Sequence, residues 1–180
     1  EDAGELNGVL RTLDRKVTRP GINPAGRGHF GYIPGGGLYP AALGDFIADV
    51  TNRYSGVYFA NPGAAVMERA LVEWMAKLVG YPEGAGGDLT SGGSIANLSA
   101  VVAAREAFDL RARDYERVVV YLTEQTHHCV DKALRVAGLA DCTIQRVPMD
   151  DGWRMRPAAL DAMVRSDRKA GLIPWLVVGS

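Results

Sequence analysis

Small side chains dominate the stretch Asp88-Leu89-Thr90-Ser91-Gly92-Gly93-Ser94-Ile95-Ala96-Asn97-Leu98-Ser99-Ala100. The apolar residues that follow its glycines have helical spacing, so a loop running into a helix is predicted. Ser94 is the predicted N-cap, and the free N–H groups of such a helix start favour an anion, most often a phosphate. A glycine-rich turn before an ordinary helix explains the same residues equally well. The stretch has neither the GxGxxG pattern of dinucleotide-binding loops nor the Gly-Lys-Ser/Thr of a Walker loop.

Helices and strands are predicted to alternate after this loop. The helix behind the glycines should run to about Arg113, and the continuous apolar run Val118–Leu122 is typical of a strand covered on both faces. Further strands are predicted at Cys142–Val147 and Leu172–Val178, and helices at residues 130–138 and 157–168. This order predicts a doubly wound α/β fold, with a mostly parallel sheet and helices on both faces.

The N-terminal part of the chain is predicted to be helical around an irregular loop. Residues 5–15 and 38–54 have helical apolar spacing, whereas Gly28–Gly37 is too rich in glycine and proline for regular structure. Asn61 and Pro62 form a typical helix start, and the helix behind them is predicted to be buried on most sides, with Trp74 in the core. We therefore divide the chain into an N-terminal segment, 1–60, and the α/β part, 61–180.

Composition excludes several classes of function. A net charge of −1, with 47% hydrophobic and 23% charged residues, predicts a globular domain and does not support nucleic-acid binding. Cys129 and Cys142 have no metal-ligand spacing around them, so no metal is expected. The residues Glu1–Gly4 do not resemble a signal peptide, and no apolar run is long enough for a membrane span, which predicts a cytoplasmic protein.

His127 is the histidine best placed for chemistry. It follows the predicted strand Val118–Leu122, and ligands of open α/β sheets bind beyond the carboxyl ends of the strands. A capping or surface histidine is the alternative interpretation of the residue alone.

Four ordered motifs resemble those of the group II pyridoxal-phosphate-dependent amino-acid decarboxylases, a family that includes aromatic-L-amino-acid, tyrosine, histidine and glutamate decarboxylases. They are YIPGGG at 32–37, NPGAAVME at 61–68, LTSGGSIANL at 89–98 and EQTHHCVDKA at 124–133. The similarity covers nearly all of the chain from about His29 onward. It implies that the chain is the first part of the large domain of a fold-type I enzyme, preceded by N-terminal helices.

The resemblance also implies roles for individual residues. Gly92, Gly93 and Ser94 would hold the phosphate of pyridoxal 5′-phosphate, and His127 would stack on the cofactor ring close to the substrate carboxylate. Tyr32, Ile33 and Pro34 match a loop that contributes to the substrate pocket, often across a dimer interface. The implied reaction is decarboxylation of an L-amino acid, aromatic or related, to the amine and carbon dioxide in a homodimeric enzyme.

The family reaction needs two more residues, a lysine that holds the cofactor covalently and an aspartate that keeps its ring nitrogen protonated. The four lysines, Lys16, Lys77, Lys132 and Lys169, match non-catalytic positions. We therefore expect a fragment or one part of a split enzyme, whose remaining C-terminal part lies in the same or a second polypeptide. The alternatives are a carbon–carbon lyase or aminotransferase of the same fold, and a non-catalytic relative that binds only the cofactor or a partner.

Overall fold

The structure is a computed structural model that describes residues 5–33 and 35–179. It divides into two units, Glu1–Met67 and Glu68–Ser180, which are described separately. Pro34, one of the predicted pocket residues, lies outside the described residues, as do Glu1–Gly4.

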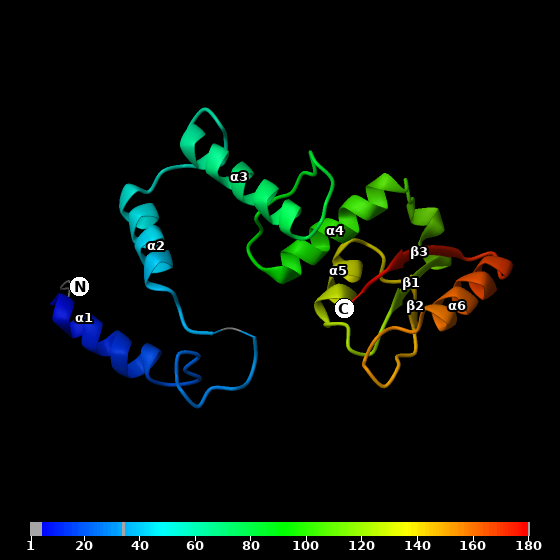
Figure 1. Ribbon diagram of the computed structural model, residues 1–180, viewed down its shortest axis with the longest axis horizontal. Helices are drawn as coiled ribbons and strands as arrows, with labels where there is room; N and C mark the ends of the chain where they lie inside the picture. Colours follow the sequence, from blue (N-terminus) through cyan, green and yellow to red (C-terminus); the bar gives the residue numbers. More distant parts are fainter. Residues whose placement is uncertain (1–4, 34, 180) are drawn as a thin grey trace. The chain divides into compact units, whose positions relative to one another are not determined.

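The first unit is helical, as predicted. It contains α1 (Leu6–Leu13), the π-helical turn η1 (Asp14–Thr18), α2 (Tyr39–Thr51) and the start of α3 (Pro62–Leu78) (Figure 1). Asn61 caps α3 as predicted, because its Oδ1 accepts the N–H of Ala64 at 3.3 Å. The apolar residues of α1 and α2 are exposed in the described chain, among them Phe46 and Ile47.

The prediction that α3 is buried on most sides is wrong for this chain. None of its residues is buried, and Trp74 is 59% exposed. Helical periodicity shows which apolar residues form one face of a helix. It does not show whether the surface that covers this face belongs to the same 180 residues.

The second unit is an α/β structure built on three parallel strands, β1 (Val118–Leu122), β2 (Thr143–Arg146) and β3 (Ile173–Val177), in the order β2-β1-β3. Val120 pairs with Ile144 on one side and Leu176 on the other, so β1 is central. Every residue of β1 is buried, which confirms the predicted strand covered on both faces.

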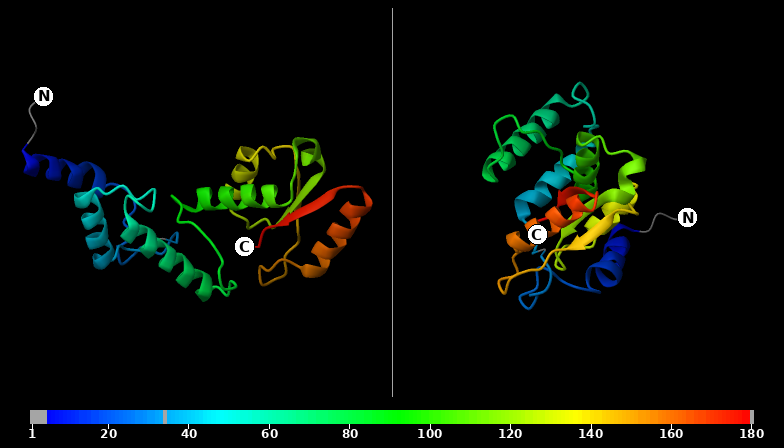
Figure 2. Two further views of the ribbon diagram at one scale, coloured as in Figure 1. Left: turned by 90° about the horizontal axis from the view of Figure 1, so that it is seen from above. Right: turned by 90° about the vertical axis from the view of Figure 1, so that its right-hand side faces the viewer.

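Helices cover both faces of this sheet. On one face, α4 (Gly93–Ala107) and α5 (Cys129–Val136) pack on Val118, Val120 and Leu122. On the other, α6 (Pro157–Lys169) packs on Val119 and Tyr121. Figure 2 shows α5 and α6 on opposite sides of the strands. The predicted doubly wound α/β arrangement is therefore confirmed.

The end of one helix differs from the prediction. The helix behind the glycine-rich loop ends at Ala107 instead of about Arg113, and the 3₁₀-helical turn η2 (Ala112–Arg117) leads into β1. Asp109 has a φ of +48°, in the left-handed region, where an α-helix cannot continue. Residues that favour helices continue past Asp109, so the sequence predicts a longer helix than the structure has.

A buried hydrogen bond ties the central strand to α6. The hydroxyl of Tyr121 donates to Oδ2 of Asp167 at 2.7 Å, and both side chains are buried. Burial raises the pKa of Tyr121, and the hydrogen bond to the neighbouring carboxylate raises it further.

Candidate functional site

The sheet topology marks one end of β1 as the place for a ligand. The chain leaves β1 through α5 to reach β2 on one side, and then returns through α6 to β3 on the other side. The strands that follow β1 in the sequence therefore lie on opposite sides of it. Open α/β sheets bind ligands at such a switch point, beyond the carboxyl ends of the strands. The turn that follows Leu122 carries His127 to this region.

The glycine-rich loop turns into α4 through Gly92. This residue has φ +109° and ψ 163°, a combination that is almost restricted to glycine. Its carbonyl accepts the N–H groups of Ile95 and Ala96, both at 3.1 Å. Gly92 is therefore the N-cap, and the prediction that Ser94 holds this position is wrong. The backbone must reverse before Gly93, and Gly92 adopts the required conformation without steric cost.

The start of α4 offers unused hydrogen-bond donors. Among the described residues, the backbone N–H groups of Gly93 and Ser94 have no acceptor, and the first turn contains no acidic residue. A side chain built onto Gly92 or Gly93 would meet no atom within 4 Å, so the space beside the loop is open. An anion fits this position, since the N–H groups and the positive end of the helix dipole both favour negative charge.

The imidazole of His127 is held by its own turn. Its Nδ1 accepts the backbone N–H of Cys129 at 3.2 Å, and its carbonyl accepts the N–H of Val130 at 3.1 Å. With Nδ1 acting as an acceptor, the neutral ring carries its proton on Nε2. The ring is exposed and lies 4.1 Å from that of His128, tilted by 35°. A flat face and an Nε2–H donor are therefore available to a ligand.

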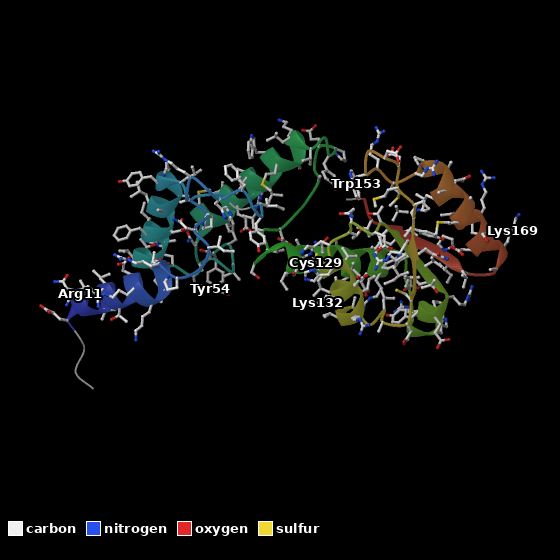
Figure 3. All side chains as sticks on the ribbon, turned by 90° about the horizontal axis from the view of Figure 1, so that it is seen from below. Arg11, Tyr54, Cys129, Lys132, Trp153 and Lys169 are labelled. Atoms are coloured by element: carbon white, nitrogen blue, oxygen red, sulfur yellow. The ribbon has the colours of Figure 1, made fainter. Side chains whose placement is uncertain are left out.

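Asn97 joins the two parts of the site. Its Nδ2 donates to the carbonyl of Gly93 at 2.9 Å and to Sγ of Cys129 at 3.4 Å. Figure 3 shows Cys129 at the start of α5, beside α4. The same two helices are joined at their other ends, where Nη1 of Arg105 donates to the carbonyl of Ala137 at 2.7 Å. The donors at the start of α4 and the turn of His127, which leads into α5, are thus held by two helices that pack together.

This arrangement fits a ligand that carries both a phosphate and an aromatic ring. The loop Gly92–Ser94 provides donors and open space for the phosphate, and His127 provides a face for the ring. Sequence reasoning found these four residues, but it missed Asn97 and Cys129. Their contact joins positions 32 residues apart, and no local pattern predicts it.

The predicted pocket residues of the N-terminal loop lie in the other unit. Tyr32 and Ile33 are exposed, and the ring of Tyr32 stacks at 6.3 Å on that of His29. Tyr32 has a φ of +65°, in the left-handed region. Their contribution to substrate binding stays a prediction.

Residues 5–33 and 35–179 contain neither a group of potential metal ligands nor a helix that could span a membrane. No three or more His, Cys, Asp or Glu side chains are grouped so as to hold a metal ion. In the same residues, no helix has the length and apolar character needed to cross a membrane.

Comparison with known proteins identifies relatives over the whole chain. The family model described as "Pyridoxal-dependent decarboxylase conserved domain" matches residues 11–180. An aromatic-L-amino-acid decarboxylase of Bacillus atrophaeus is 33% identical over 181 residues, which cover 100% of this chain and 37% of that protein. A tyrosine decarboxylase of Oryza sativa subsp. japonica is 33% identical over 156 residues, or 81% of this chain and 29% of that protein. The chain therefore spans less than two fifths of the length of these curated relatives.

Solved structures share the fold. The crystal structure of Oryza sativa TDC with PLP superposes with a TM-score of 0.82 and 27% identity, covering 97% of this chain and 41% of that one. Rhodiola rosea 4-hydroxyphenylacetaldehyde synthase has a TM-score of 0.85 at 23% identity, covering 98% of this chain and 40% of that one, a likeness of fold alone.

Proposed function

The chain belongs to the pyridoxal-dependent decarboxylase family, and from this premise we propose that it supplies the phosphate-binding and ring-stacking part of a decarboxylase active site. The observation that carries the proposal is the contact between Asn97 and Cys129, because it holds the open donors of α4 beside the turn of His127. The donors and the ring face match the two ends of pyridoxal 5′-phosphate.

Gly92, Gly93 and Ser94 are the proposed phosphate-binding residues. The N–H groups of Gly93 and Ser94 would donate to phosphate oxygens, and the hydroxyl of Ser94 adds a further donor. The absence of a side chain at Gly92 and Gly93 lets the phosphate approach the backbone. These contacts bind and orient the group; they take no part in bond breaking.

His127 is the proposed catalytic residue of this chain. Its ring face would stack on the cofactor ring, and its Nε2–H would face the substrate carboxylate. When bound, pyridoxal 5′-phosphate supplies an electron sink for the pair left behind when a bond to the substrate's α-carbon breaks. The Cys129 N–H fixes the tautomer of His127, so that the ring presents a donor at Nε2 and not an acceptor.

The proposed reaction is decarboxylation of an L-amino acid, aromatic or related, in which carbon dioxide leaves and a proton takes its place on the α-carbon. Tyr32 and Ile33, with Pro34, are the proposed contributors to substrate binding. We propose that the covalent lysine and the ring-nitrogen aspartate come from residues outside these 180, in the same or a second polypeptide. A second copy of the protein would cover the exposed apolar faces of α2 and α3 in a homodimer, and the protein would act in the cytoplasm.

The test compares two neighbouring histidines in the whole protein that carries this chain. H127A should weaken binding of pyridoxal 5′-phosphate about tenfold or more and lower carbon dioxide release, because the stacked ring is lost. H128A is the matched control and should retain both. H127F, which keeps an aromatic face but cannot accept from Cys129, should recover part of the affinity and little of the activity.

The same assay separates the alternatives. Formation of a keto acid without carbon dioxide would show an aminotransferase, and cleavage of another carbon–carbon bond would show a lyase of a different kind. Cofactor binding without turnover would leave a binding-only relative. Equal effects of H127A and H128A would refute the assignment of His127.

A further inference from the structure

We infer that Arg146 is a positioning residue for the turn that carries His127, an inference that rests on the proposed function. Arg146 is the last residue of β2 and pairs in register with Leu122, the last residue of β1. Its guanidinium therefore lies beside the point where the chain leaves the central strand. No motif in the sequence points to this residue.

All three guanidinium nitrogens of Arg146 contact the segment that holds the turn. Nη1 donates to the carbonyl of Thr123 at 3.3 Å, and Nε lies 3.9 Å from Oε1 of Glu124. Nη2 lies 3.5 Å from Oδ2 of Asp131, in the first turn of α5. Thr123 and Glu124 begin the turn and Asp131 follows it, so a single side chain spans both of its ends.

The contact with Asp131 matters most because of the other carboxylate oxygen. Among the described residues, Oδ1 of Asp131 is buried without a hydrogen-bond partner. Arg146 is thus the ion-pair partner of this partly buried carboxylate, and its removal would take away that pairing while Oδ1 still lacks a hydrogen bond. The Glu124 contact is more exposed and longer, so it contributes less.

The position of the His127 ring depends on the position of the start of α5. Nδ1 of His127 accepts the N–H of Cys129, and the backbone carbonyl of His127 accepts the N–H of Val130; both donors lie within the first turn of that helix. A shift of Asp131 relative to Thr123 would therefore change the geometry of the hydrogen bond that the imidazole accepts from Cys129. Arg146 acts through the backbone of the turn. Among the described residues its polar contacts are with Thr123, Glu124 and Asp131, and not with His127 or the loop Gly92–Ser94.

The first experiment measures amide hydrogen exchange of residues 123–130 in the full chain, without cofactor. R146M should accelerate exchange in this segment about three- to tenfold, because both anchors of the turn are lost. R165M is the matched control: Nε of Arg165 pairs with Asp161 at 2.8 Å on the exposed surface of α6, away from the turn. R146K, which keeps the charge but cannot reach three acceptors at once, should lie between R146M and the unchanged protein.

The second experiment reads the imidazole itself. Nuclear magnetic resonance of the labelled His127 ring should report mainly the Nε2–H tautomer in the unchanged chain and a mixture of tautomers in R146M. A merely structural loss elsewhere, as in R165M, should leave the ring signals unchanged. If R146M does not fold, R146K and D131N decide the point, and both should move the signals in the same direction.

A third experiment measures cofactor affinity, and so tests whether the order of the turn and the tautomer of His127 affect binding. R146M should weaken binding of pyridoxal 5′-phosphate about threefold or more, and this effect should vanish in the H127A background if Arg146 acts through His127. An equal loss in both backgrounds, or unchanged exchange and ring signals in R146M, would overturn the inference. If the unchanged protein binds no cofactor, the proposed function fails, while the exchange and ring measurements still decide whether Arg146 orders the turn.

Discussion

The side-chain amide of Asn97 lies 3.4 Å from the thiol sulfur of Cys129, and this contact joins the N-terminal part of α4 to the first turn of α5. The same amide donates to the carbonyl of Gly93 at 2.9 Å. One polar group thus holds the donors at the start of α4 and the turn of His127 in a fixed relation.

Replacing Asn97 by alanine should loosen this relation. We expect N97A to lower the free energy of unfolding by about 1 kcal/mol, because one backbone carbonyl and one weak sulfur acceptor lose their donor. Affinity for pyridoxal 5′-phosphate should fall severalfold, as measured by fluorescence titration. S99A, on the exposed part of the same helix, serves as the control and should change neither quantity.

Gly92 should not tolerate a side chain. At φ +109° and ψ 163°, an alanine is strained although the space around it is open, so G92A should cost about 1–3 kcal/mol in urea unfolding. G93A places the same methyl group at the first helical position, again in open space, and should be neutral or slightly stabilising. Equal unfolding midpoints for the two variants would contradict the assigned N-cap.

The buried pair of Tyr121 and Asp167 should contribute to stability. Y121F removes the hydroxyl that donates to Oδ2 of Asp167 and leaves a buried carboxylate oxygen without its donor. The free energy of unfolding should fall by about 1–3 kcal/mol, measured by urea denaturation at neutral pH. Y81F changes a tyrosine that is 66% exposed and should leave the midpoint unchanged.

The same pair predicts a loss of stability in alkali. Burial and the bond to Asp167 raise the pKa of Tyr121 in the folded protein above its value in the unfolded chain. The unfolded chain therefore loses this proton first, so the stability from the pair is fully present below about pH 10 and declines as the pH rises further. Urea midpoints followed from about pH 8 to pH 11 should fall more steeply in the unchanged protein than in Y121F.

Much of the secondary structure in both units could be predicted from sequence because its signals are local. The apolar run Val118–Leu122 indicates a strand buried on both faces, and Asn61–Pro62 indicates a helix start; the structure confirms both. The N-cap was assigned to Ser94 because serine is a preferred capping residue, whereas the backbone reversal requires the glycine at Gly92. Burial of α3 was also predicted wrongly, because an apolar stripe does not reveal which surface covers it.

The sequence by itself determined the α/β fold, the family and the short motifs around Gly92 and His127, since each depends on local patterns and on their order along the chain. The tertiary structure alone decided which groups meet. Asn97 reaches Cys129 across 32 residues, and Arg146 reaches Thr123 and Asp131 because β2 lies beside β1. Such contacts follow from the packing of helices and the register of strands, which no local pattern of side chains encodes.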